Sequence, residues 1–199
     1  MQQSGSELHV VAVVGSPRAH GNTSLLVAAA FEELSRRGLR CDKVMLGERR
    51  IAPCLGHEDC ADLPACPHGD AAADVLELVY AADCLILASP VYYENVSAQM
   101  KAFIDRNVFR YAHDEWLAAK AVGLIAVTAE TGLDETLAAL RRYVALSTHG
   151  DVPVFSLGGY ADKLGAAAAD AELLAAARRL GADLAGALGL NPARSPASR

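Results

Sequence analysis

The sequence predicts an open, doubly wound α/β fold, in which helices cover both faces of a five-stranded parallel sheet with strand order 2-1-3-4-5. Short apolar runs rich in β-branched residues alternate with helical patterns along most of the chain. The length of 199 residues suits one domain, predicted over 1–199 with its core at about 8–190. Right-handed crossovers between parallel strands then leave few possible topologies.

The first expected strand, Leu8–Gly15, is a near-continuous β-branched run of the kind that is buried on both faces of a parallel sheet. The other expected strands are Arg40–Leu46, Cys84–Ala88, Ala121–Thr128 and Val152–Leu157. Apolar residues at helical spacing predict five helices, and Ser97 is expected to cap the third. These helices are Thr23–Arg37, Asp70–Ala82, Ser97–Tyr111, Asp134–Ser147 and Ala168–Leu188. The segment Ile51–Gly69 has no periodicity and is expected to be a long loop.

Composition excludes several classes of protein. The net charge of −6 argues against a nucleic-acid surface, which needs clustered Lys and Arg. The apolar runs are too short to span a bilayer, and the first nine residues lack the pattern of a signal peptide. We therefore expect a soluble, cytoplasmic protein that binds neither nucleic acid nor membrane. Its five cysteines are then expected to be thiols or metal ligands instead of disulfides.

The predicted strand order is the flavodoxin-like one, and it locates the site. In such sheets ligands bind beyond the carboxyl ends of the strands, near the switch point between strands 1 and 3. The loops after strands 1, 3 and 4 are therefore where function is expected.

The loop after strand 1 has the composition of a phosphate-binding loop. It joins a buried strand to a helix N-terminus, where unpaired N–H groups and the helix dipole favour an anion. It contains neither GxGxxG nor GxxxxGK[ST], so a single phosphate of a mononucleotide fits it better than a dinucleotide. The alternative is an ordinary capped turn. The expected phosphate-binding residues are Ser16, Arg18, Gly21, Asn22, Thr23 and Ser24.

The loop after strand 3 carries adjacent aromatic residues. Pro90 is expected to end the strand, and Tyr92 and Tyr93 then stand at the ligand edge, where they suit the lining of a flat ring system. Glu94 and Asn95 add polar groups. The alternative is that both tyrosines cover the core or an interface.

The two loops together, GSPRAHGNTS and SPVYYENVSAQMKAFIDR, resemble the NADPH-dependent FMN reductase family. They are especially similar to its branch of iron–sulfur flavoproteins and multimeric flavodoxin-like NAD(P)H oxidoreductases. The likeness runs from about Val10 to Leu188. It implies that the loop after strand 1 surrounds the FMN phosphate. It implies that the ribityl chain and isoalloxazine are lined by Pro90, Val91, Tyr92, Tyr93 and Asn95.

The loop after strand 4 is expected to meet the pyrimidine edge of the flavin, where the family usually has a glycine-rich turn. This loop keeps Gly132, and Thr128, Ala129 and Glu130 are expected to present backbone N–H groups there. Such donors would stabilise negative charge on a reduced flavin.

The long loop contains three cysteines, Cys54, Cys60 and Cys66, that match three of the four cluster cysteines of the iron–sulfur branch. His57 stands where that branch has its second cysteine. Three thiolates and an imidazole could hold an iron–sulfur cluster or zinc. We expect no metal, with these four residues as the candidates if one binds.

The predicted function is that of an FMN-dependent NAD(P)H oxidoreductase, in which NADH or NADPH is the co-substrate and a quinone, a flavin or a similar small electrophile is the acceptor. The flavin carries the chemistry, so no catalytic side chain is predicted. The alternative is an electron-transfer flavoprotein of the iron–sulfur type. A weaker third possibility is a flavodoxin-like binding module without cofactor.

The helix after strand 3 and the segment behind it suggest an assembly. A homodimer or tetramer is expected to form through aromatic and apolar side chains favoured at interfaces. Those residues are Val108, Phe109, Tyr111 and Trp116. Lys101, Asp105 and Arg106 are expected to form a solvated or interface surface.

Overall fold

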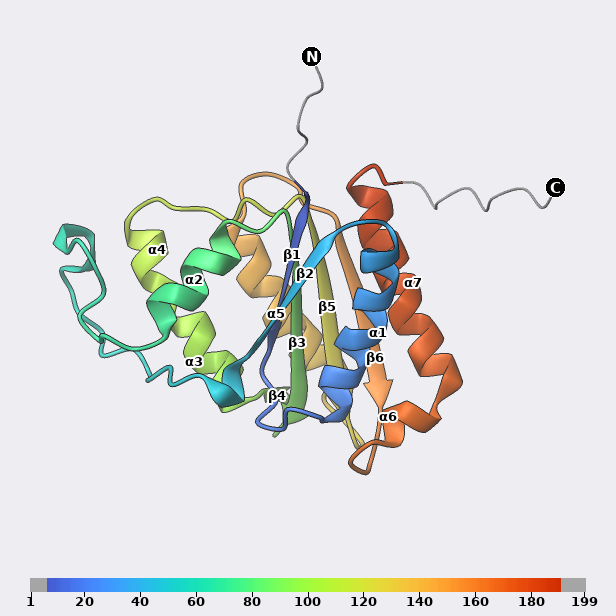
Figure 1. The fold of residues 1–199 in the computed structure, drawn as a ribbon. Coiled ribbons are helices and arrows are strands. Elements are labelled where there is room, and N and C mark those ends of the chain that lie inside the picture. The colour runs from blue at the N-terminus through green and yellow to red at the C-terminus, as the bar shows by residue number, and fades with distance from the viewer. Residues whose placement is uncertain (1–6, 191–199) are drawn as a thin grey trace, which may run out of the picture.

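A computed structural model describes residues 7–190 of the chain. Its main sheet is parallel, with the strand order β2-β1-β3-β5-β6 (Figure 1). The strands are β1 (His9–Val14), β2 (Arg40–Met45), β3 (Cys84–Tyr92), β5 (Ala121–Thr128) and β6 (Val154–Tyr160). These five strands confirm the predicted order. A short strand that was not predicted, β4 (Asn95–Val96), pairs antiparallel with the end of β3.

Helices cover both faces of the sheet (Figure 1). One face carries α1 (Asn22–Arg36), α6 (Ala166–Ala169) and α7 (Ala171–Ala187). The other face carries α2 (Ala72–Tyr80), α3 (Ala98–Arg106), α4 (Val108–Ala112) and α5 (Leu133–Ser147). Two short 3₁₀ helices, η1 (Leu46–Glu48) and η2 (Cys60–Asp62), lie in loops.

Strand β1 shows why the apolar run is continuous. Val10, Ala12 and Val14 pack with α1 and α7, whereas Val11 and Val13 pack with the helices of the other face. Successive side chains of a strand point to opposite faces, so a strand covered on both sides needs apolar residues at every position.

The expectation that Pro90 ends the third strand is wrong. Strand β3 continues through Pro90, which lies opposite Val127, to Tyr92. A proline is tolerated near the end of a strand because few ladder hydrogen bonds remain to be lost there. The extension moves the turn between β3 and β4 further beyond the sheet.

The expected helix Ser97–Tyr111 is in fact two helices that meet at Asn107. The Asn107 side-chain amide donates to the carbonyl of Phe103 at 2.7 Å. A side chain that binds nearby carbonyl oxygens competes with the helical backbone ladder. Similarly, the last helix begins later than expected, at Ala171, because Asp170 caps it by accepting from Leu173 N.

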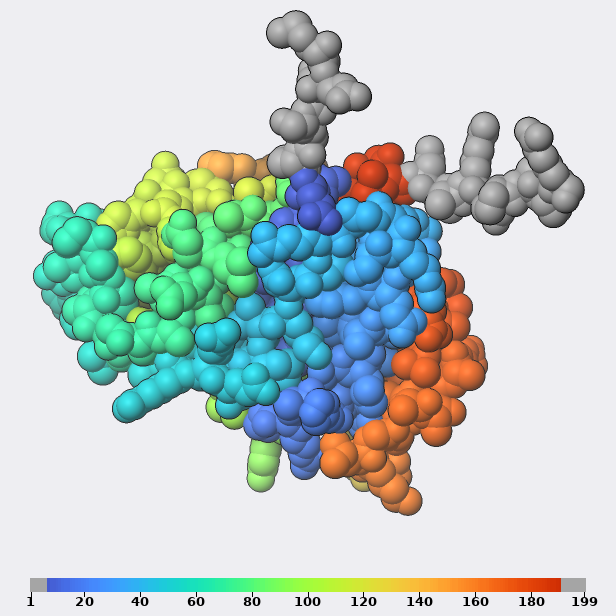
Figure 2. Space-filling model, viewed as in Figure 1, coloured from blue at the N-terminus to red at the C-terminus, as the bar shows by residue number. Residues whose placement is uncertain are grey.

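The carboxyl ends of the parallel strands meet at one end of the molecule, the lower end in Figure 1. The space-filling view shows the segment after β1, the β3–β4 turn and the segment after β6 together at this end (Figure 2). Within residues 7–190, no helix has the length and apolarity to cross a membrane.

Candidate functional site

The first turn of α1 presents free backbone donors. Its N-cap, Gly21, has no side chain to accept from them, and the turn contains no acidic residue. Within the described part of the chain, the N–H groups of Asn22, Thr23 and Ser24 have no acceptor. Helices α3 and α7 are capped by the side chains of Ser97 and Asp170, whereas α5 also begins at a glycine without a side-chain cap. An uncapped helix N-terminus after the first strand of such a sheet suits a phosphate.

The loop that leads into α1 is held by its own contacts. The Arg18 N–H donates to Ser16 Oγ at 3.1 Å, and the Gly21 N–H donates to the Arg18 carbonyl at 3.1 Å. The Thr23 side chain is buried and forms no hydrogen bond among residues 7–190. The Arg18 side chain is exposed. The loop therefore combines a backbone held by its own hydrogen bonds, a hydroxyl without a partner and an exposed cation, which together fit an FMN phosphate.

Two of the expected phosphate ligands also have other partners. The Asn22 side chain donates to the Lys163 carbonyl at 2.7 Å and accepts from Ala167 N at 3.2 Å, so it fixes the segment after β6. The Ser24 hydroxyl accepts from Lys43 Nζ at 2.9 Å. The side chains of Asn22 and Ser24 are therefore engaged in holding neighbouring segments, which the sequence did not predict.

The turn between β3 and β4 is tight and strained. Its two central residues, Tyr93 and Glu94, have positive φ angles of 50° and 55°. Positive φ at both positions is the geometry of a type I′ hairpin turn, which normally uses Asn and Gly. Non-glycine residues there cost about 1–3 kcal/mol each, and such strain is concentrated at functional sites. The Tyr93 side chain is fully exposed, and that of Tyr92 is 43% exposed.

Gly132 supports this turn from the loop after β5. A Cβ on Gly132 would lie 2.6 Å from the Cα of Glu94, so the two backbones are in direct contact. Gly132 also has a φ of 84°, which disfavours any other residue. The loops after strands β3 and β5 are therefore in direct contact at this turn.

One expected donor in the loop after β5 is used within the loop. The Glu130 N–H donates to Thr128 Oγ1 at 3.2 Å, and Thr128 Oγ1 donates to the Thr131 carbonyl at 2.6 Å. The expectation that Glu130 N–H is free for a flavin is therefore wrong. The Ala129 N–H has no acceptor among the described residues.

Ser97 joins the loop after β1 to the loop after β3. Its hydroxyl donates to the Gly15 carbonyl at 2.6 Å, and its N–H donates to Ser89 Oγ at 3.0 Å. The same hydroxyl accepts from Met100 N as the cap of α3. A Cβ on Gly15 would lie 2.8 Å from Ser97 Oγ. The sequence predicted only the cap, because a contact across 82 residues leaves no local pattern.

Each cysteine sulfur of the long loop has a partner within the protein. Cys54 Sγ accepts from Gly56 N at 3.4 Å, and Cys60 Sγ donates to the His57 carbonyl at 3.5 Å. Cys66 Sγ accepts from Arg106 Nη2 at 3.1 Å. Burial and the neighbouring thiols raise the pKa of Cys60. Among residues 7–190, no three His, Cys, Asp or Glu side chains converge on a point that suits a metal ion.

Arg106 fixes the base of the same loop, so the expectation that it lies on a solvated surface is wrong. It is 3% exposed, and its Nη1 donates to Asp70 Oδ2 at 2.7 Å and to the Ala52 carbonyl at 3.1 Å. Burial opposes ionisation of Asp70, but hydrogen bonds from Arg106, Ala52 N and Ala72 N hold its pKa at about 2. In this arrangement the three cysteine thiols are engaged within the protein and do not converge on one point, although His68 Nε2 of the same loop is buried without a partner among the described residues.

The fold and the site together define a class. A doubly wound parallel sheet, an uncapped helix after its first strand and an aromatic turn after the central strand are the features of a flavodoxin-like mononucleotide-binding protein.

Comparisons with known proteins specify the class further. The sequence model of the NADPH-dependent FMN reductase family matches residues 8–175. The chain belongs to this family, and it is thus a flavoprotein of the oxidoreductase class.

Similar sequences include iron–sulfur flavoproteins of archaea. The chain is 40% identical to one of Archaeoglobus fulgidus over 154 residues, which are 77% of this chain and 67% of that protein. It is 37% identical to one of Methanocaldococcus jannaschii over 100 residues. That match covers 50% of this chain and 52% of the relative, so it extends over only about half of each protein.

Solved structures with low sequence identity share the fold. An NAD(P)H:quinone oxidoreductase from Methanothermobacter marburgensis has a TM-score of 0.69 at 19% identity, with 90% of this chain and 98% of that chain covered. An archaeal flavodoxin has a TM-score of 0.56 at 11% identity, with 92% and 99% covered. These likenesses bear on the fold alone.

Proposed function

We propose that this protein is an FMN-dependent oxidoreductase that takes electrons from NADH or NADPH and passes them to a small acceptor such as a quinone or a flavin. The observation that carries the proposal is the pair of loops joined by Ser97. One loop leaves helix N–H groups free for a phosphate, and the other places aromatic side chains beyond the sheet edge.

Different residues of the chain would bind different parts of FMN. The free N–H groups of Asn22, Thr23 and Ser24, together with the Arg18 guanidinium, would hold the FMN phosphate. Pro90, Val91, Tyr92, Tyr93 and Asn95 would border the ribityl chain and the ring. Bound FMN would supply the redox chemistry itself. The protein would then need only to position the flavin and to polarise it, without a catalytic acid or base. The free N–H of Ala129 would supply one such dipole.

The alternative, an electron carrier of the iron–sulfur type, is favoured by the names of the archaeal relatives. It would need a cluster bound by the cysteine loop. The contact between Arg106 and Cys66 and the absence of a fourth cysteine at His57 weigh against it.

We also propose that the protein forms a homodimer or tetramer through the surface around α4. Val108 and Tyr111 are 46% and 68% exposed there, as is Leu146 on α5 at 55%. These three residues border an apolar groove of about 360 Å³ between α3–α4 and α5. The other two residues expected at this interface, Phe109 and Trp116, are only partly exposed. The Trp116 ring packs against the His149 ring, with centroids 4.0 Å apart.

Anaerobic mixing of the FMN-loaded protein with NADH or NADPH tests the enzymatic proposal. We expect the flavin absorbance to bleach rapidly and to recover when a quinone is added. We expect the flavin to have one open face at the edge of the sheet, with room for one planar partner at a time. The nicotinamide and the acceptor would then occupy it in turn, so the steady-state kinetics should be ping-pong. If neither nucleotide bleaches the flavin within minutes while reduced ferredoxin does, the electron-carrier alternative replaces this proposal.

A further inference from the structure

The two edge strands of the main sheet differ in how they are protected against pairing with another chain. Within residues 7–190, β2 and β6 each have a single neighbour in the sheet. Three of the six residues of β2 are charged, namely Arg40, Asp42 and Lys43. Strand β6, with the sequence VFSLGGY, contains neither a charged residue nor a proline. Charges and prolines are the usual means by which an edge strand avoids pairing, so β6 is an unprotected edge.

The outward backbone groups of β6 are free. The Pro153 carbonyl, just before the strand, accepts from Val122 N of β5 at 2.9 Å. Just after the strand, Ala161 N donates to the Thr128 carbonyl of β5 at 2.8 Å. Because the backbone groups of successive residues point to opposite sides of a strand, the even-numbered residues between these two contacts face outward. They are Val154, Ser156, Gly158 and Tyr160, and their N–H and carbonyl groups have no backbone partner in the part of the chain that the structure describes.

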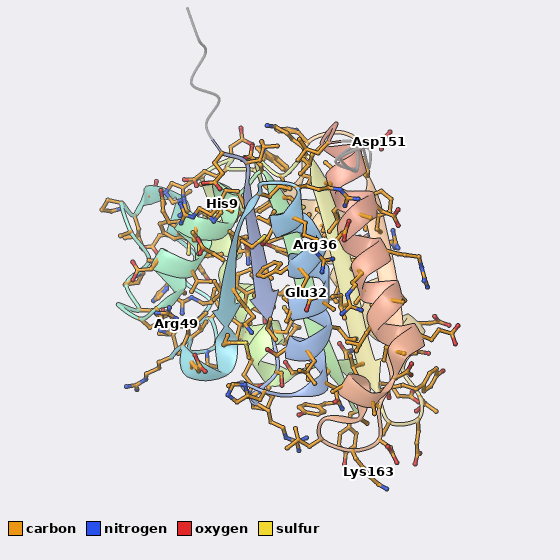
Figure 3. All side chains as sticks on the ribbon, turned by 45° about the vertical axis from the view of Figure 1, so that its right-hand side comes forward. His9, Glu32, Arg36, Arg49, Asp151 and Lys163 are labelled. Atoms are coloured by element: carbon orange, nitrogen blue, oxygen red, sulfur yellow. The ribbon has the colours of Figure 1, made fainter. Side chains whose placement is uncertain are left out.

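Helix α7 borders this edge. Figure 3 shows α7 beside β6, with Asp151 before the strand and Lys163 after it. Two hollows of about 350 Å³ and 270 Å³ lie between the strand and the helix. Both are lined by Leu157, Ala176 and Arg179. The hollows therefore adjoin along the free edge, and Leu157, the central residue of β6, lies where they meet.

The charges that α7 presents beside the edge suit a second copy of the same chain. The polar and small residues of α7 that line the hollows are Glu172, Ala176, Arg179 and Asp183. Their spacing of four, three and four residues puts them on one face of the helix. Among residues 7–190, neither Glu172 nor Arg179 forms an ion pair. A two-fold axis between Ala175 and Ala176 would place Glu172 of each copy opposite Arg179 of the other.

The strand is self-complementary about the same position. A two-fold axis through Leu157 relates two copies of β6 as antiparallel neighbours. Each outward residue then lies opposite an outward residue of the second copy, Val154 opposite Tyr160 and Ser156 opposite Gly158. Opposed residues of this kind exchange two hydrogen bonds in an antiparallel ladder. Since Leu157 and Ala176 line the same hollows, one axis satisfies both the strand and the helix.

We infer that β6 and α7 form an isologous interface, through which two copies of the chain join their sheets edge to edge across a two-fold axis. This interface shares no residue with the groove around α4, and it does not depend on the oxidoreductase function. A chain that used both surfaces would form a tetramer with two kinds of interface.

Charge reversal in the full chain tests the inference, with sedimentation velocity at micromolar concentration as the measurement. Arg179→Glu should raise the dissociation constant of this interface at least about tenfold, because each copy loses an ion pair and gains a repulsion. The double reversal Glu172→Arg/Arg179→Glu should restore assembly, because it exchanges the two charges. Arg49→Glu is the matched control. It reverses an exposed cation on the opposite side of the molecule (Figure 3) and should leave the mass of the assembly unchanged.

The variant Leu146→Glu distinguishes this interface from the one around α4. It introduces a charge into the α4 groove and leaves β6 and α7 intact. We expect Leu146→Glu to remain a dimer and to become a monomer when Arg179→Glu is added. If the parent is a dimer that only Arg179→Glu dissociates, the proposal for α4 fails and this inference stands. A monomeric Leu146→Glu protein would overturn the inference and leave the α4 interface in place.

Hydrogen exchange reports the pairing of the strand directly. In the assembled parent, the N–H groups of the four outward residues of β6 should exchange slowly, and Arg179→Glu should accelerate them at least about tenfold. The inward N–H groups, which donate to β5, should be unaffected. The inference is overturned by fast exchange of the outward groups in an assembled parent, by an unchanged mass in Arg179→Glu, or by a double reversal that does not restore assembly.

Discussion

The loop after β1 and the cysteine loop differ in how their polar groups are satisfied. In the loop after β1 and the first turn of α1, three successive backbone N–H groups have no acceptor among the described residues. In the cysteine loop, Cys54, Cys60 and Cys66 each have a hydrogen-bond partner in the protein, and Arg106 closes the base. Figure 1 shows the cysteine loop, before α2, well to the side of the carboxyl end of the sheet.

This contrast indicates which loop awaits a ligand. Backbone N–H groups without an acceptor at a helix N-terminus suit an anionic ligand that accepts from them. In the cysteine loop the three thiols are engaged within the protein, and His68 Nε2 is the ring nitrogen there that is buried without a partner among the described residues. The cysteine loop has a sequence that resembles a metal site, whereas the loop after β1 has the geometry of a binding site.

The largest expected effect tests whether Arg106 holds the cysteine loop. Arg106→Met should lower the free energy of unfolding by about 3–5 kcal/mol, because it leaves the buried Asp70 carboxylate unpaired. Urea denaturation measures the change. Arg178→Ala, which breaks the exposed ion pair with Glu32, is the matched control and should cost at most about 1 kcal/mol. Equal losses of unfolding free energy in the two variants would show that Arg106 does not hold the cysteine loop in place.

The next effect concerns the loop after β1. The double variant Arg18→Ala/Thr23→Ala should weaken FMN binding by about 1–3 kcal/mol for each lost charged contact. Titration with FMN and with riboflavin measures it, and the riboflavin affinity should change little because riboflavin lacks the phosphate. FMN bound as tightly by the double variant as by the parent would contradict the phosphate assignment.

Local patterns explain what the sequence could predict. The nearly continuous apolar runs of β1 and β5 predicted burial on both faces, and alternation with helices left few topologies, of which the flavodoxin-like order was chosen. Contacts between distant residues left no such pattern. Arg106 looked like a surface residue of a helix because Asp70 and Cys66, its partners, lie 36 and 40 residues away.

The candidate site likewise has features that the sequence could predict and features that it could not. The glycines, hydroxyls and tyrosines identified the two loops, because each residue type has a local chemical role there. The strain at Tyr93 and Glu94 could not be predicted, since it depends on the extension of β3 past Pro90 and on the contact with Gly132. Likewise, Asn22 could not be seen to reach Lys163.

A smaller effect should appear in acid. The pKa of Asp70 in the folded protein, about 2, lies below the ordinary value of about 3.9 expected for the unfolded chain. The stability that it contributes is thus fully present above about pH 4 and is lost as the pH falls through about 2. Unfolding free energy measured between pH 5 and pH 2 should fall more steeply in the parent than in Asp70→Asn. Parallel curves would contradict the pairing with Arg106.

The smallest expected effect is the response of the cysteine loop to iron. Anaerobic incubation of the parent with ferrous iron and sulfide, followed by desalting, should leave no stoichiometric iron and no cluster absorbance beside the flavin bands. The reason is that Cys66 already accepts from Arg106 and that His57 replaces one thiolate.

The variant His57→Cys separates these two causes. If it takes up a cluster, the missing thiolate alone excludes iron, and the hydrogen bond from Arg106 is too weak to compete with a metal–sulfur bond. If it does not, the closed network around Arg106 excludes the cluster, as the contrast between the two loops implies. Full iron and sulfide incorporation by the parent itself would contradict that contrast, because thiols that already have partners in the protein would then bind a cluster after all. The electron-carrier alternative would gain its cofactor.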